Sequence, residues 1–189
     1  MNQRDKLLAG ALQCLREKGY AATTARDIAA ASGANLASIG YHFGSKDALM
    51  SLASLQGVSD WGDAVAEAAA AIPDLDTPAL RVAAFLSGLR ADFPAARPVL
   101  SGLVESHARA QFDPDIREAL AANAREGHQL LAAVALGIPY DAVTDAEAAT
   151  VGVTYYALIA GFVLQELIAP QSTPDAPDVV NALALVAAS

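Results

Sequence analysis

Apolar residues recur every three or four positions near the start of the chain, and this helical spacing continues through much of the sequence. In the first such stretch, residues 3–18, the apolar residues that share one helical face are Leu7, Leu8, Ala11, Leu12 and Leu15. Ala and Leu dominate the composition and aromatic residues make up only 6%, so good helix formers are abundant and strand formers are scarce. The sequence therefore predicts an all-helical protein.

Capping signals and breakers divide the chain into nine predicted helices and no strand. Thr24 followed by Asp27, and Thr144 followed by Glu147, have the spacing of capping boxes at helix starts. Gly33 stops the second helix, and the three residues 33–35 lead into the third, which is the geometry of a helix-turn-helix. The predicted helices span residues 3–18, 24–32, 36–43, 46–72, 78–92, 95–110, 114–136, 144–168 and 178–188.

Charge is distributed unevenly along the chain. Residues 1–50 hold six Lys or Arg against four acids, whereas the remaining 139 residues hold six Arg, no Lys and seventeen acids. This asymmetry suggests one segment that meets a polyanion and another that repels it, although chance variation along a soluble chain would also explain it.

The stretch ASIGYHFGSKDAL, residues 37–49, places polar side chains on one side of the short third helix. At 100° per residue the predicted core face carries Leu36, Ile39 and Phe43. The opposite, outward face carries Ala37, Ser38, Tyr41 and His42. Ser45 then caps the fourth helix, whose positive end with Lys46 would suit a phosphate.

The block T-x-x-x-I-A-x-x-S-G at residues 24–33, followed by ASIGYHFGSKDAL, resembles the DNA-binding domain of TetR-family transcriptional regulators. The resemblance implies that the third helix enters the major groove and that homodimers bind a palindromic operator on double-stranded DNA. It implies a helix-turn-helix DNA-binding domain at residues 1–46 and a helical effector-binding and dimerisation domain at residues 47–189. The expected DNA-contacting residues are Thr24, Arg26, Leu36, Ala37, Ser38, Tyr41, His42 and Lys46.

Gly40 departs from the family pattern, because many relatives carry an aromatic residue directly before the Tyr-His pair. A glycine inside a helix costs about 1 kcal/mol relative to alanine. Each contact residue also has a plain structural interpretation: Tyr41 as a surface aromatic, His42 as a packing residue, and Lys46 as a solvated lysine.

The C-terminal part is strongly apolar. Residues 148–165 carry no charge, and we expect a buried core helix there and no membrane span. With the last helix they would form a dimer interface, as the family does, through Tyr156, Ala157, Gly161, Leu164, Val179 and Leu183. An effector pocket, expected to take a small apolar compound, would draw on Trp61, Phe85, Tyr155 and Phe162.

No motif indicates an enzyme, a cofactor or a metal, and the single cysteine, Cys14, fits a reducing, cytoplasmic compartment. The leading hypothesis is a ligand-responsive, DNA-binding transcriptional regulator, a repressor by analogy with the family. The alternative is a helical small-molecule-binding or interaction module whose helix-turn-helix no longer functions. Gly40 and the net charge of −9 favour that alternative.

Overall fold

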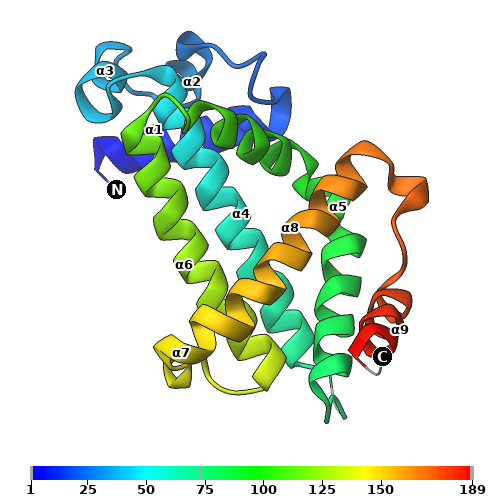
Figure 1. Cartoon of the computed structure of the whole chain (residues 1–189). Helices are drawn as coiled ribbons and strands as arrows, with labels where there is room; N and C mark the ends of the chain where they lie inside the picture. The colour runs from blue at the N-terminus through cyan, green and yellow to red at the C-terminus, as the bar shows by residue number, and fades with distance from the viewer. Residues whose placement is uncertain (1, 73, 188–189) are drawn as a thin grey trace. The chain divides into compact units, whose positions relative to one another are not determined.

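The computed structural model describes residues 2–72 and 74–187, which are helical and contain no strand (Figure 1). A π-helical turn, η2 (Ala148–Gly152), joins α7 to α8, and short 3₁₀ turns, η1 (Tyr140–Ala142) and η3 (Pro170–Ser172), lie between helices. The α-helices are α1 (Gln3–Lys18), α2 (Ala25–Ser32), α3 (Ala37–Phe43), α4 (Lys46–Ala70), α5 (Pro78–Arg109), α6 (Pro114–Leu136), α7 (Asp145–Glu147), α8 (Val153–Ile168) and α9 (Ala176–Ala187). The predicted all-α fold is confirmed.

Most helix boundaries follow the capping signals. Both predicted capping boxes are present, since Thr24 and Asp27 exchange hydrogen bonds at the start of α2, and Thr144 and Glu147 do so at the start of α7. Gly33 ends α2 with a φ of 65°, a left-handed conformation that glycine adopts without steric cost.

The predicted break between the fifth and sixth helices is wrong, because α5 runs without interruption from Pro78 to Arg109. Pro94 and Pro98 lie inside it, although each removes a backbone N–H donor and costs about 3 kcal/mol in a helix interior. The apolar residues around the two prolines, Phe93, Ala96 and Val99, are all buried. Burial of these side chains offsets the cost of the two prolines to the helix backbone. With α5 continuous, the described residues form eight helices when α7, η2 and α8 are counted as one.

The chain divides into two compact units. The first comprises the chain up to Asp60 together with Ala95–Asn123, and the second comprises Trp61–Pro94 and the chain from Ala124 onward. α4, α5 and α6 therefore each contribute residues to both units. The functional division at residues 46 and 47 stays a prediction.

In the first unit, α1, α2 and α3 pack together (Figure 1). Gly10 allows α1 to approach α2 closely, since a Cβ atom there would lie 2.8 Å from Ser32 Cβ. The fully buried apolar side chains of this core include Leu7, Leu15, Ile28, Leu49 and Met50. This core fixes the position of α3.

In the second unit, the hydrophobic core lies between α5, α6, α8 and α9. Val82, Leu86, Ala135 and Phe162 form a buried cluster there. At Gly152 the π turn approaches α6 so closely that a Cβ atom would lie 2.1 Å from the carbonyl oxygen of His128. Only a glycine fits this crossing.

The apolar helical stretch Asp145–Ile168 is less buried than the sequence predicted. By length and composition alone, with a mean hydropathy of 1.6, it could cross a membrane, but core helices of soluble proteins pass the same test. The prediction of a buried core helix is wrong for a single chain, because only 11% of the apolar 18-residue window within this stretch is buried. The exposed large apolar residues of α8 are Val153, Leu158, Leu164 and Ile168.

Candidate functional site

The turn between α2 and α3 presents α3 at the surface of the first unit. After Gly33, the Asn35 side chain accepts a hydrogen bond from the Ala37 backbone N–H at 3.0 Å, which caps the start of α3. Ile39 is 4% exposed and anchors the inner face of the helix. The buried Ile39 and the hydrogen bond from Ala37 to Asn35 together hold the opposite face of α3 toward solvent.

Tyr41 is the most prominent side chain of this outward face. It is 86% exposed, and its ring meets that of His42 edge-on with the centroids 4.9 Å apart. Ala37 is also exposed, whereas Ser38 and His42 are half-buried. Within the described part of the chain the Tyr41 hydroxyl has no hydrogen-bond partner, which leaves it available to an external acceptor.

The prediction that Leu36 belongs to the core is wrong, because its side chain is 45% exposed. Leu36 is the N-cap residue of α3 and has helical dihedral angles, φ −52° and ψ −41°, so its place on the predicted core face does not bury it. Its exposure places an apolar side chain beside the outward face instead.

Two residues of α1 that the sequence analysis did not single out contact α3. The Gln3 side-chain amide donates to Ser38 Oγ at 2.8 Å, and the Arg4 guanidinium lies 5.1 Å from the centre of the Phe43 ring. Because Ser38 accepts this hydrogen bond, its own proton remains free for a base edge or phosphate. No local pattern could have revealed these pairs, which join residues 35 or more positions apart.

Arg26 and Thr24 lie at the start of α2 and differ in how they are engaged. Arg26 is exposed and has no hydrogen bond or ion pair with any described residue, so its guanidinium is free for a phosphate or base. The Thr24 hydroxyl is engaged in the capping box. Asp27 also pairs with Lys18 at 2.5 Å, and hydrogen bonds from Lys18 and then Thr24 hold the pKa of Asp27 well below its usual range.

Lys46 is more constrained than its sequence position predicted. Its ammonium donates to the carbonyl oxygen of Thr23 at 3.2 Å, pairs with the Asp47 carboxylate at 3.2 Å, and lies 5.5 Å from the centre of the Tyr20 ring. Asp47 in turn pairs with Arg109 at 2.8 Å. One of the three ammonium protons of Lys46 remains for an external acceptor.

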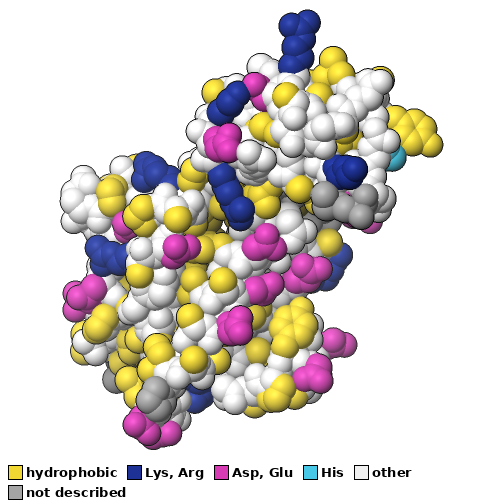
Figure 2. Space-filling model, turned by 180° about the vertical axis from the view of Figure 1, so that it is seen from behind, with side chains coloured by type: hydrophobic (Ala, Val, Ile, Leu, Met, Phe, Trp, Pro, Cys, Tyr) yellow, Lys and Arg dark blue, Asp and Glu magenta, His cyan; other side chains and the backbone are white. Residues whose placement is uncertain are grey.

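The charged side chains of the N-terminal helices are directed into solvent. Arg4, Lys6, Arg16 and Arg26 are exposed, and Figure 2 shows Lys and Arg side chains projecting from the N-terminal part of the surface. Exposed cations on α1 and α2 would attract a polyanion.

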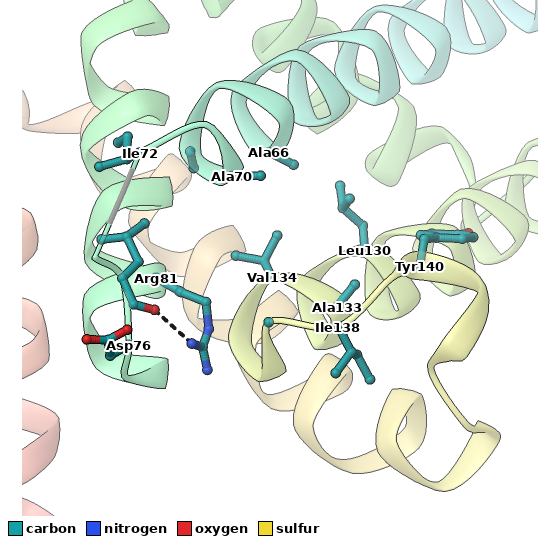
Figure 3. A pocket seen from close by; sticks show the side chains of 13 residues that line it. Ala66, Ala70, Ile72, Asp76, Arg81, Leu130, Ala133, Val134, Ile138 and Tyr140 are labelled. Atoms are coloured by element: carbon teal, nitrogen blue, oxygen red, sulfur yellow. Dashed lines mark hydrogen bonds between the residues drawn. The ribbon is translucent and has the colours of Figure 1, made fainter.

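In the second unit, a cavity of about 500 Å³ lies between the C-terminal ends of α4 and α6 and the start of α5 (Figure 3). None of the four predicted pocket aromatics lines it. The residues that do are Ala66, Ala69, Ala70, Ile72, Leu75, Asp76, Arg81, Leu130, Ala133, Val134, Gly137, Ile138 and Tyr140.

A second, smaller cavity of about 220 Å³ lies between α5, α8 and α9 and contains two of the predicted pocket residues, Tyr155 and Phe162. The other two, Trp61 and Phe85, are buried and line neither cavity. Trp61 packs edge-on against Phe93, with the ring centroids 6.5 Å apart.

The residues predicted for the dimer interface fall into two groups. Ala157, Gly161 and Leu164 are exposed on α8, and a Cβ atom at Gly161 would have no neighbour within 4 Å. Val179 and Leu183 on α9 line the smaller cavity, which Gly161 also borders.

Tyr156 does not belong to this exposed face. Its ring packs edge-on against that of His128 on α6, with the centroids 4.9 Å apart, and burial raises the pKa of its hydroxyl. The structure thus places Tyr156 in a contact within the chain.

Comparison with known proteins identifies the N-terminal part. Residues 7–53 match the family model described as bacterial regulatory proteins, tetR family. This segment includes α2, α3 and every predicted DNA-contacting residue. Members of this family are non-enzymatic DNA-binding proteins. No curated protein sequence matches the chain.

Solved structures similar to the chain show its fold. A proposed transcriptional regulator of Rhodococcus sp. RHA1 is 18% identical, with 95% of this chain and 92% of that chain covered and a TM-score of 0.73. A proposed regulator of Streptomyces coelicolor is 22% identical, with 97% of each chain covered and a TM-score of 0.68. The multidrug binding protein EbrR, solved with imidazole, is 24% identical, with 97% and 95% covered and a TM-score of 0.67. Residues 7–53 therefore match the DNA-binding segment of the tetR family of bacterial regulatory proteins, and the whole length of the chain has the fold of solved transcriptional regulators.

Proposed function

We propose that the protein is a ligand-responsive transcriptional regulator, acting as a repressor, which binds a palindromic operator as a homodimer. The observation that carries this proposal is the outward face of α3, where Tyr41 is 86% exposed and lacks an internal partner. Ala37, Ser38 and Arg26 would read or approach base edges in the major groove, and Tyr41, His42 and Lys46 would bind phosphates. Thr24 and Leu36 flank these contacts.

Homodimer formation is supported by the uncovered apolar face of α8. Leu158, Leu164 and Ile168 are 40%, 44% and 81% exposed, and monomeric soluble proteins rarely leave such a continuous apolar face in water. Ala157 and Gly161 are small enough to let a partner helix approach closely. A two-fold dimer would present two α3 helices to half-sites about 34 to 36 Å apart.

A small-molecule response is supported by the two cavities of the second unit, which are independent of the DNA-binding residues. The similar protein EbrR has been solved with imidazole and with proflavin. A ligand that preferred one conformation about 100-fold would shift the equilibrium by about 2.7 kcal/mol, which is sufficient to release an operator. Such a regulator would act in the cytoplasm.

Footprinting of the purified protein on the DNA upstream of its own gene tests this proposal. We expect protection of two half-sites related by a dyad and one helical turn apart. Protection of a single half-site would contradict the dimer, and absence of protection anywhere on this DNA would favour the alternative of a binding module with a non-functional helix-turn-helix. A matched pair of variants adds specificity: Arg26→Ala should weaken protection, whereas Arg125→Ala, an exposed arginine of α6, should not.

A further inference from the structure

The larger cavity of the second unit combines an apolar wall with a single fixed cation. Leu130 and Val134 of α6 and Ala66 and Ala70 of α4 lie around a common space (Figure 3), and Ile138 after α6 also lines the cavity. Its volume of about 500 Å³ lies within the range of small-molecule sites. The charged side chains at its wall are Arg81 and Asp76.

Arg81, in the first turn of α5, is held rigidly by backbone carbonyl groups. Its Nε and Nη2 atoms both donate to the carbonyl oxygen of Ala135, at 3.2 and 3.0 Å, and Nη1 donates to that of Leu75 at 2.8 Å. Gly137 makes room for the guanidinium, since a Cβ atom there would lie 2.8 Å from Arg81 Cζ. The Arg81 side chain therefore bonds to Leu75, 6 positions away in the sequence, and to Ala135, 54 positions away. These bonds fix its orientation before any ligand binds.

The three hydrogen bonds leave part of the guanidinium unused. Arginine carries five N–H groups, so one proton on Nη1 and one on Nη2 remain without a described acceptor. Asp76 is exposed and forms no ion pair with Arg81 within the described residues. Because arginine stays protonated at any physiological pH, the half-buried guanidinium is a permanent positive charge without a carboxylate partner.

We propose that this cavity binds a small organic anion with an apolar body, in which a carboxylate receives the two free N–H groups of Arg81. Charge-assisted pairs of this kind are stronger than neutral hydrogen bonds, and the fork of the guanidinium matches the two oxygens of a carboxylate. The apolar wall would hold the hydrocarbon part of the ligand. This inference rests on the proposed function only in naming the class of effector, and the binding site itself can be tested without DNA.

Two other interpretations give different results. If Arg81 only caps the C-terminal end of α6, the ligand's charge will not affect binding. If the exposed Asp76, together with Asp63 and Glu126 near Tyr140, dominates the field, a cation will bind best. The pKa of Tyr140 is raised mainly by burial and further by the negative charges of Glu126 and Asp63.

The test is calorimetric titration of the whole protein with three probes of similar shape: 2-naphthoate, neutral 2-naphthamide and cationic 2-naphthylmethylammonium. We expect 2-naphthoate to bind at least about tenfold more tightly than the amide, and the cation to bind weakest. Arg81→Gln should remove the preference for the anion, whereas Arg90→Gln, which alters another arginine of α5 outside the cavity, should keep it.

Because Arg81→Gln also loses the contacts to Ala135 and Leu75, a second variant leaves the guanidinium intact. Ala66→Leu would fill the cavity from α4 and should weaken 2-naphthoate binding, while Ala68→Leu, at an exposed position of the same helix outside the cavity, should not. Equal affinity for naphthoate and naphthamide, tighter binding of the cation, no binding of 2-naphthoate, or unchanged affinity in Ala66→Leu would each overturn the inference. None of these results depends on operator binding, whose failure would be seen by footprinting alone.

Discussion

Replacement of Gly152 by alanine should destabilise the second unit, because this residue lies where η2 crosses α6. The new Cβ atom would lie 2.1 Å from the carbonyl oxygen of His128 and 2.7 Å from its carbonyl carbon. Both atoms belong to the backbone of a helix, so the clash cannot be relieved by rotating a side chain, and the two segments must separate. Overpacking of this kind costs about 1 to 3 kcal/mol, occasionally more, while the alanine itself regains only about 0.5 to 1 kcal/mol of helix stability.

We therefore expect Gly152→Ala to lose about 2 kcal/mol, which for a chain of this size lowers Tm by about 4 to 8 °C. Thermal and urea unfolding followed by circular dichroism, at one protein concentration, would measure the loss. Gly62→Ala is the matched control, because its Cβ atom would meet Leu130 at an ordinary 3.7 Å and the substitution should stabilise α4 slightly. If Gly152→Ala unfolds at or above the midpoint of the natural protein, the crossing of η2 and α6 does not require a glycine.

Three further substitutions probe other parts of the molecule. Gly40→Ala should stabilise the protein by about 0.5 to 1 kcal/mol in thermal unfolding, since a Cβ atom there meets nothing within 4 Å; a loss of stability would show a hidden constraint on α3. Asp27→Asn should destabilise the protein at neutral pH. Folding lowers the pKa of Asp27, so its contribution to stability is fully present above its ordinary pKa of about 3.9 and is lost as the pH falls further. The difference in stability between the natural protein and Asp27→Asn should therefore shrink in acid, and a difference that does not depend on pH would contradict this. Leu164→Glu should convert a dimer to a monomer in light scattering without unfolding the chain, because this side chain is 44% exposed within one chain; an unchanged dimer would place the interface elsewhere.

The first three helices could be predicted closely because their ends depend on local chemistry. The cap at Thr24, the left-handed glycine at Gly33 and the Ser45 cap each act within four residues, so their effect can be seen in the sequence. The outward face of α3 follows from the same local periodicity. Leu36 shows the limit of that method, because periodicity gives the side that a residue faces but not whether another segment covers it, and this side chain is 45% exposed.

The features that the sequence did not predict depend on contacts between distant segments. The continuity of α5 through Pro94 and Pro98 depends on burial of the flanking side chains, and the π turn depends on the crossing at Gly152. No pattern in the sequence singles out Arg81, because its partners include Ala135, 54 positions away. The sequence also predicts aromatic residues at the pocket, whereas the larger cavity is lined mainly by alanine and branched aliphatic side chains.

Binding of double-stranded DNA by the outward face of α3 can be measured as operator affinity at increasing salt concentrations. Fluorescence anisotropy of a labelled fragment from upstream of the gene would compare the natural protein with Tyr41→Ala. We predict that affinity falls steeply as salt rises, since phosphate contacts release counterions, and that Tyr41→Ala binds at least about fivefold more weakly while its unfolding curve is unchanged. Affinity that does not respond to salt, or equal binding by Tyr41→Ala, would show that this face of α3 does not bind the operator.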